Sequence, residues 1–268
     1  MDVIGIASGK GGVGKTATAI NLAVSLALRG QKVMLFDADL GLANAQLALG
    51  CSTEYNFSHV LSGEKSLDEI IVTTRQGIRL VPGASGVQKL ASLGANEAAA
   101  IVQVFSSIEE EIDYLIVDSA AGISNSVLTF MQASQRRLIV LRDEPSSIAD
   151  AYGTIKVLVK DCNLDEIYVV PNMVESQAAG AQLYRRVNEV CDRFLGKTLQ
   201  YLTSIESDEM ILAALKKYQS VMEFAPASAG ARDYRRLADA ITHLPSISHV
   251  SGGLQFFMER LVRQNQGA

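Results

Sequence analysis

One short glycine-rich segment, Gly9–Thr16 (GKGGVGKT), limits the possible folds of this chain more than any other feature. It follows the apolar run Val3–Ala7 and precedes a helical stretch, Thr16–Arg29, that Gly30 closes. The segment fits the pattern G-x-x-x-x-G-K-[ST], in which glycines let backbone N–H groups turn inward around phosphate oxygens. The order of strand, loop and helix therefore predicts a nucleotide-binding loop at the start of the helix.

The side chains of this loop have separate expected roles. Lys15 is expected to bridge the terminal phosphates of a nucleotide, and Thr16 to hold Mg²⁺ through its hydroxyl group. The surrounding backbone is expected to supply N–H groups to the phosphates. Nucleotide-binding residues are thus predicted at seven consecutive positions: Gly11, Gly12, Val13, Gly14, Lys15, Thr16 and Ala17.

Short apolar runs alternate with longer helical patterns along most of the chain. The runs are continuously apolar, as in strands of a parallel sheet that helices cover on both faces. They predict one doubly wound α/β domain with a mainly parallel sheet. Strands are expected at Val3–Ala7, Lys32–Phe36, Ile78–Val81, Tyr114–Val117, Leu138–Leu141, Ile167–Val170 and Leu199–Leu202. Further helices are expected at about 96–112, 124–134, 147–161 and 177–195.

Composition restricts the class of protein. The chain has 268 residues, of which 48% are hydrophobic and 20% charged, so it is long enough to bury a sizeable core. No apolar run approaches the ~18 residues of a membrane span, and no signal-peptide pattern opens the sequence. We therefore expect a cytoplasmic protein with a nucleotide-binding domain at 1–244, a linker at 245–253 and a C-terminal amphipathic helix at 254–268.

Acidic residues follow two of the expected strands. Asp37 and Asp39 come directly after Lys32–Phe36, and Asp118 follows Tyr114–Val117. The carboxyl ends of parallel strands face the ligand crevice, so these carboxylates are expected beside the phosphate loop. An apolar run that ends in aspartate is the Walker B pattern, and Asp118 is expected to hold Mg²⁺ through a water molecule. Asp37 is expected to support the site.

The second lysine of the loop, Lys10, makes the motif more specific. GKGGVGKT resembles the deviant Walker A motif of the MinD/ParA family of P-loop ATPases. The resemblance implies slow Mg²⁺-dependent ATP hydrolysis, a homodimer that forms with ATP, and a Lys10 that contacts the partner's nucleotide. It also implies that Asp39 orients the attacking water. The predicted catalytic residues are Lys10, Lys15, Asp39 and Asp118, and the predicted metal-site residues are Thr16, Asp39 and Asp118.

The sequence favours adenine over guanine as the base. No N-K-x-D or T-K-x-D motif, which GTPases of this fold usually carry, follows a later expected strand. Asn172, at the end of an expected strand, matches the adenine-contacting asparagine of the family. The segment Ile205–Asp208 matches the family's loop against the base, and the resemblance therefore adds Glu206 and Asp208 to the nucleotide-binding residues.

Several longer stretches resemble the flagellar branch of this family, the FleN or FlhG regulators. The branch implies control of flagellar number or assembly, with a flagellar transcription activator or basal-body proteins as partners. The stretches are Asp37–Asn44, Pro82–Gly86, Val117–Ile123, Asp143–Tyr152, Asp192–Leu195 and Leu254–Val262.

Three other functions stay open. A ParA-type ATPase that positions DNA or cargo would use a basic surface, which the net charge of −5 does not favour, and no specific nucleic acid partner is expected. An iron–sulfur relative would need paired cysteines, whereas Cys51, Cys162 and Cys191 are scattered. A small-molecule kinase of the same fold has no short signature that would reveal it.

The C-terminal segment carries an apolar stripe at helical spacing, which Phe256 widens. One reading is a peripheral contact of 254–264 with the inner membrane surface. The other is that the stripe packs on the domain itself. The stripe consists of Leu254, Phe257, Met258, Leu261 and Val262.

Overall fold

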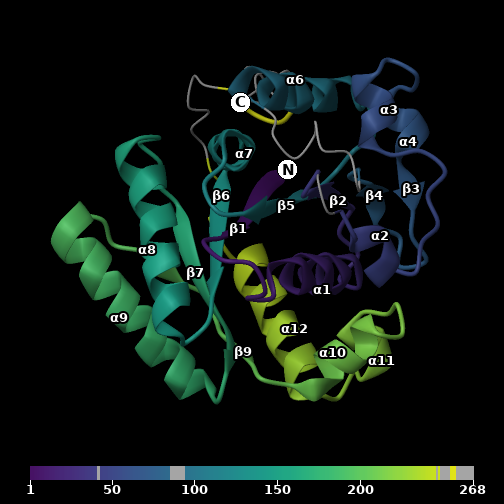
Figure 1. Cartoon of the computed structure of the whole chain (residues 1–268). Helices are drawn as coiled ribbons and strands as arrows, with labels where there is room; N and C mark the ends of the chain where they lie inside the picture. The colour runs from purple at the N-terminus through teal and green to yellow at the C-terminus, as the bar shows by residue number, and fades with distance from the viewer. Residues whose placement is uncertain (41–42, 85–93, 246, 248–253, 258–268) are drawn as a thin grey trace.

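A single sheet runs through the computed structural model, which describes residues 1–40, 43–84, 94–245, 247 and 254–257. In the described part of the chain the sheet has nine strands in the order β3-β4-β2-β5-β1-β6-β7-β8, and β9 also pairs with β7 (Figure 1). All of these pairings are parallel except that of β3 with β4. The strands are β1 (Asp2–Ser8), β2 (Val33–Ala38), β3 (Val72–Thr73), β4 (Arg79–Val81), β5 (Tyr114–Ala121), β6 (Arg136–Leu141), β7 (Ile167–Val174), β8 (Gln200–Tyr201) and β9 (Ile205–Glu206).

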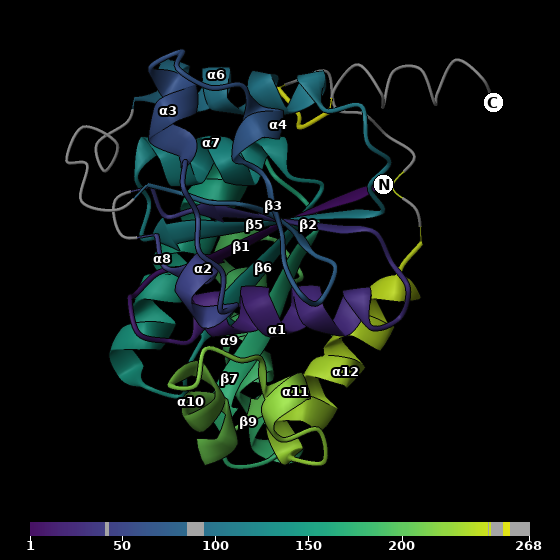
Figure 2. The ribbon, with the colours of Figure 1, turned by 90° about the vertical axis from the view of Figure 1, so that its right-hand side faces the viewer.

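Helices cover both faces of the sheet (Figure 2). Helices α6 and α7 lie on one side, and α1, α10, α11 and α12 lie on the other. The helices are α1 (Lys15–Ala27), α2 (Ala45–Ala48), α3 (Phe57–Leu61), α4 (Leu67–Ile70), α6 (Ala95–Val104), α7 (Asn125–Ala133), α8 (Pro145–Lys160), α9 (Gln177–Leu195), α10 (Glu209–Leu215), α11 (Val221–Phe224) and α12 (Ala229–Thr242), with a 3₁₀ turn η1 (Phe105–Ser107).

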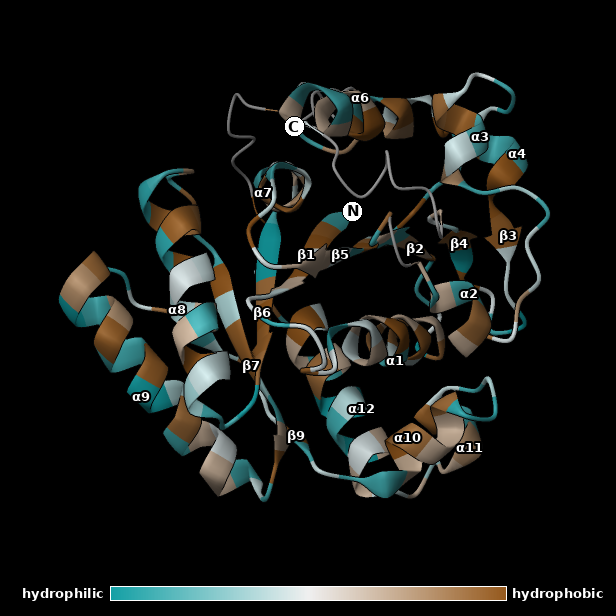
Figure 3. Ribbon diagram, viewed as in Figure 1, coloured by the Kyte–Doolittle hydropathy of each residue, from teal (hydrophilic) through white to brown (hydrophobic). Residues whose placement is uncertain are grey.

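The hydrophobic core has two parts, one on each face of the sheet. Alternate residues of β1 divide between them: Val3 and Ala7 face the part that contains α6 to α9, whereas Ile4 and Ile6 face α1 and α12. Both faces of the strands are therefore apolar, and Figure 3 shows this as largely brown strands beside helices of mixed colour. This confirms the predicted α/β class and its mainly parallel sheet.

The predicted strands and the helices predicted before residue 196 overlap elements of the structure, but the sequence pattern missed several others. Each of the seven expected strands overlaps a strand of the structure, whereas β3 and β9 were not predicted. The helix expected over 96–112 was wrong in length, because α6 ends at Val104 and Phe105–Ser107 continues as a 3₁₀ turn. Helix α12 was missed although its polar and apolar residues alternate at helical spacing.

The start of the expected C-terminal helix differs from the prediction. Residues 254–255 have no regular structure and 256–257 form a turn in which Phe257 has a positive φ of 56°, so these residues do not begin a helix. Phe256 and Phe257 are both buried, and their rings lie 5.0 and 6.0 Å from the ring of Phe105. Burial of two aromatic rings outweighs the local helical pattern, since each removes a large apolar area from water. These two side chains pack on the domain itself.

The remainder of that segment, 258–268, lies outside the described residues. The helix expected there, and the membrane contact expected for 254–264, stay predictions. Among the described residues no helix is both long and apolar enough to cross a membrane.

Candidate nucleotide-binding site

The phosphate loop joins the central strand β1 to α1 at the carboxyl edge of the sheet. Gly12 and Gly14 have positive φ values of 78° and 89°, which favour glycine. A Cβ atom on Gly14 would lie 2.2 Å from Nδ2 of Asn172, so no side chain fits there. Helix α1 begins at Lys15, directly after the loop, and points its positive end at the same place. The local geometry is therefore that of an anion-binding loop.

A cavity of about 710 Å³ opens beside this loop. Its polar end is formed by loop residues and Asp39, and its other end by β7, the segment after β9 and apolar residues of α2 and α10. A ligand pocket of this size, polar at one end and apolar at the other, suits a nucleotide. All but one of the residues predicted to bind nucleotide line the cavity, and the exception is Val13. The lining residues among them are Gly11, Gly12, Gly14, Lys15, Thr16, Ala17, Asn172, Glu206 and Asp208.

Lys15, Thr16 and Asp118 meet at the polar end. The Nζ atom of Lys15 lies 2.6 Å from Oδ1 of Asp118 and 3.5 Å from Oγ1 of Thr16. Oδ2 of Asp118 is buried and has no hydrogen-bond partner among the described residues. A buried carboxylate oxygen without a partner carries a desolvation cost that a cation or a bound water would relieve. One carboxylate and one hydroxyl group fit Mg²⁺, which keeps several waters and phosphate oxygens as ligands.

Asp37 and Asp39, two residues apart, have different surroundings and different roles. Asp37 is buried, and its Oδ2 accepts the backbone N–H groups of Asn44 and Ala45, both at 2.8 Å. These bonds hold the start of α2 against the end of β2. Burial, followed by the nearby charge of Asp118, raises the pKa of Asp37 to about 7. Asp39 instead lines the cavity, where a ligand can reach it.

The buried Asp37 gives a testable pH dependence. Its pKa is raised from 3.8, so its contribution to stability is complete below about pH 4 and is lost as the pH rises through about 7. Asparagine can accept the same two N–H groups without a buried charge. Asp37→Asn should therefore raise the free energy of unfolding at pH 8 by about 2–4 kcal/mol, and change it little at pH 4. Urea unfolding between these pH values measures this, and parallel pH profiles would contradict it.

Asn172 has a fixed orientation at the nucleoside end. Its Nδ2 donates a hydrogen bond to the carbonyl oxygen of Val13 at 2.7 Å. Because a carbonyl oxygen only accepts, the Oδ1 atom of Asn172 must be the free end, and it is buried without a partner within the described ranges. The site therefore offers a hydrogen-bond acceptor next to the phosphate loop.

Glu206 and Asp208 line the cavity, but their carboxylates serve the protein. Glu206 accepts the N–H of Gln177 and pairs with Arg232 at 2.9 Å. Asp208 caps α10 by accepting the N–H of Met210. The structure therefore brings both residues to the cavity, but their carboxylates are engaged by other groups of the protein.

Sequence reasoning missed the apolar walls of the cavity. Leu47 in α2 and Leu212 in α10 line it and are 55% and 58% exposed. Tyr218, which follows α10, also lines it and is 58% exposed. No pattern in the sequence separates these residues from ordinary packing residues, because only their exposure beside the cavity identifies them.

Lys10 does not line this cavity. Its Nζ donates to Oγ of Ser146 at 2.9 Å and lies 4.0 Å from a carboxylate oxygen of Glu144. The Lys10 side chain is 45% exposed. Its charge is therefore directed along the outside of the domain, toward the start of α8, and away from the phosphate end.

The fold and the site define the class of this protein. A mainly parallel sheet with a G-x-x-x-x-G-K-[ST] loop after its central strand, and a Walker B aspartate within the neighbouring strand β5, is a P-loop nucleoside triphosphatase. Comparison with known proteins identifies the family. The family model described as ParA, NUBPL iron-transfer P-loop NTPase, matches residues 1–242, and the chain belongs to this MinD/ParA family.

The relatives include flagellar regulators. The chain is 40% identical to the antiactivator FleN of Pseudomonas aeruginosa, over 98% of this chain and 94% of that protein. It is 34% identical to the flagellum site-determining protein YlxH of Helicobacter pylori, over 97% and 89% of the two chains. The solved structure of the cell division ATPase MinD of Pyrococcus furiosus matches with a TM-score of 0.76 and 26% identity, covering 91% and 99%. The predicted resemblance to this family and its flagellar branch is confirmed.

Proposed function

We propose that this protein is an ATP-dependent, dimerising switch ATPase that regulates flagellar number or assembly. The observation that carries the proposal is the 40% identity to the antiactivator FleN along nearly the whole of both chains. The proposed partner is a flagellar transcription activator or a basal-body protein, since one relative is named an antiactivator and another a flagellum site-determining protein.

The orientation of Asn172 supports ATP as the nucleotide. Its free Oδ1 is an acceptor, and adenine presents an amine donor at the position where guanine presents a carbonyl acceptor. Guanine would therefore place two acceptors face to face beside the loop. Apolar residues such as Leu47 and Leu212 would cover the faces of the base.

The polar end supports hydrolysis. Lys15 would neutralise charge on the terminal phosphates, and Asp39 would orient the attacking water from the cavity wall. Thr16 and Asp118 fit Mg²⁺, which would neutralise the charge of the β- and γ-phosphates when bound. Each of these groups lies at the carboxyl edge of the sheet.

The direction of Lys10 supports a role in a dimer. A second cation in the loop that leaves its own cavity is available to a neighbouring molecule. If Lys10 completes the site of a second copy, the nucleotide becomes part of the interface, and ATP must favour the dimer by linkage. We expect a two-fold symmetric dimer.

Light scattering tests this function directly. The protein should be a monomer with ADP and a dimer with ATP and Mg²⁺, and a bound flagellar activator should be recovered with the ATP form. Lys15→Ala is the matched control, because it removes a contact to the nucleotide and should stay monomeric in both conditions. An unchanged mass of the unaltered protein with ADP and ATP would contradict the proposal.

A further inference from the structure

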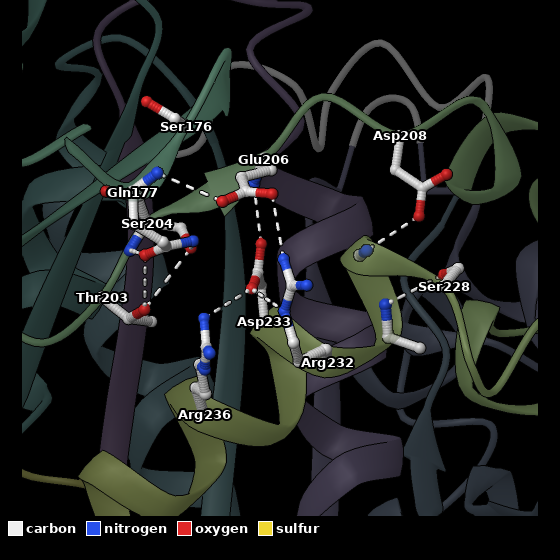
Figure 4. Close-up of polar contacts among 12 residues, drawn as sticks. Ser176, Gln177, Thr203, Ser204, Glu206, Asp208, Ser228, Arg232, Asp233 and Arg236 are labelled. Atoms are coloured by element: carbon white, nitrogen blue, oxygen red, sulfur yellow. Dashed lines mark hydrogen bonds and ion pairs between the residues drawn. The ribbon is translucent and has the colours of Figure 1, made fainter. Parts of the chain in front are cut away.

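A second group of polar residues surrounds β9 and the segments beside it (Figure 4). We call residues 204–208, which include β9, the nucleoside loop. Its residues Glu206, Ser207 and Asp208 form part of the cavity wall next to Asn172. The strand pairing of Ile205 with Asn172 places the loop directly beside the strand that carries this asparagine.

Strand β7 holds the nucleoside loop on one side only. The N–H of Ser207 donates to the carbonyl of Val174 at 2.8 Å, but the register of β7 and β9 shifts between Asn172 and Val174. Successive N–H groups of a strand point to opposite sides, so the N–H of Glu206 points away from β7. An anchor for this N–H must come from another element.

Asp233 of α12 supplies that anchor. Its Oδ2 accepts the N–H of Glu206 at 3.0 Å, across 27 residues of sequence. Its Oδ1 lies 3.2 Å from Nε of Arg232 and 3.4 Å from Nη1 of Arg236. Asp233 is fully buried, and a buried carboxylate is costly unless such partners surround it. Figure 4 shows this carboxylate between the loop and the two arginines.

Two further contacts complete the support of the loop. Arg232 also reaches Oε2 of Glu206 at 2.9 Å, so the loop and Asp233 share one guanidinium group. Gln177 of α9 contacts the other end of the loop, where its Nε2 donates to the carbonyl of Ser204 at 3.0 Å. The loop is therefore fixed from α12 and α9, and three of its residues line the cavity.

We infer that Asp233 is a positioning residue for the nucleobase, which sets the preference for ATP over GTP by holding the nucleoside loop beside Asn172. This inference rests on the proposed ATP specificity. Selection between bases depends on well-aligned hydrogen bonds, and a shift of the loop by a few tenths of an ångström weakens each of these bonds. Asp233 does not line the cavity, so in this role it acts through Glu206, whose N–H it accepts.

Asp233→Asn is the informative substitution. The amide oxygen will turn toward Arg232 and Arg236, so the amide nitrogen will face the N–H of Glu206, donor against donor. The loop should then move away from Asp233 although the size of the side chain is unchanged. Asp239→Asn is the matched control on the same helix, since among the described residues the Asp239 carboxylate contacts only Arg29, and the side chain is 57% exposed.

The experiment is calorimetric binding of ATP, GTP and inorganic triphosphate to the full chain with Mg²⁺. Asp233→Asn should weaken ATP binding about tenfold and lower the ATP-to-GTP preference by a similar factor, as expected for a lost hydrogen bond to a charged group. Binding of inorganic triphosphate should stay unchanged, because it uses the phosphate loop alone. Asp239→Asn should change none of the three.

The outcomes separate this inference from the proposed function. If Asp233→Asn lowers the melting temperature but keeps the ATP-to-GTP preference, Asp233 has a purely structural role and the inference is overturned. If the unaltered protein shows no preference for ATP over GTP, the proposed specificity fails and the inference fails with it. Should Asp233→Asn not fold, Arg232→Gln at a partly exposed position must lower the preference about threefold, or the inference is equally overturned.

Discussion

Asp39→Ala will reduce ATP hydrolysis by about 10²-fold or more while ATP binding and ATP-driven dimerisation remain. Asp39 lines the cavity, whereas the neighbouring buried Asp37 holds the start of α2 through two hydrogen bonds. Its removal should therefore affect the orientation of the attacking water and leave the bound ground state intact. Phosphate release under single-turnover conditions measures hydrolysis, and light scattering on the same sample measures the dimer.

A matched control is Asp68→Ala, which removes an exposed aspartate in α4, away from the cavity. It should hydrolyse ATP at the unaltered rate. Normal hydrolysis by Asp39→Ala would show that another group orients the water. Loss of ATP binding in this variant would instead place Asp39 among the residues that hold the ground state.

Lys10→Ala will lower turnover by about 10³-fold, the range found for cationic groups that one molecule inserts into the site of another. Binding of ATP to the monomer should remain, since Lys10 contacts Ser146 and Glu144 and does not line its own cavity. Turnover measured above the dimerisation concentration reports the loss. Lys10→Arg should recover part of the activity, because it restores a cation of similar reach.

Mixing two inactive variants gives the sharpest form of this prediction. In a mixed dimer of Lys10→Ala and Asp39→Ala, one of the two sites has Asp39 from one subunit and Lys10 from the other. With random assortment half of the dimers are mixed, and each mixed dimer has one of its two sites intact. The mixture should therefore show roughly a quarter of the unaltered activity, given a two-fold symmetric dimer. Absence of any recovery on mixing would show that Lys10 acts within its own subunit.

The features that sequence predicted well are local ones. The phosphate loop is a continuous segment whose glycines and lysine lie close together in the sequence. Asp118 was predicted from the apolar strand that contains it. Asn172 also follows from its place on a strand. Such residues lie at the carboxyl edge of the sheet once the strand order is that of a parallel α/β fold.

The features that sequence did not predict depend on distant contacts. Asp233 reads as one acidic residue among arginines on a helix, and only the fold brings its carboxylate to the N–H of Glu206. Glu206 and Asp208 were expected at the nucleotide because of their position, and both line the cavity. The carboxylate of Glu206 pairs with Arg232, and that of Asp208 accepts a backbone N–H of α10. No local sequence pattern reveals these contacts.

The late position of Phe256 and Phe257 in the sequence has a consequence for how the protein is made. Their rings pack on Phe105 and, for Phe256, near Phe130, in the part of the core that α6 and α7 cover. Each ring contributes about 3–5 kcal/mol by the cost of removing such a side chain, a large share of the stability of a typical domain. A nascent chain cannot close this core until residue 257 has left the ribosome, long after β1 and the phosphate loop have emerged. This part of the core should therefore close only after residue 257 has emerged, and until then the chain should be a client of chaperones that cover exposed apolar surface.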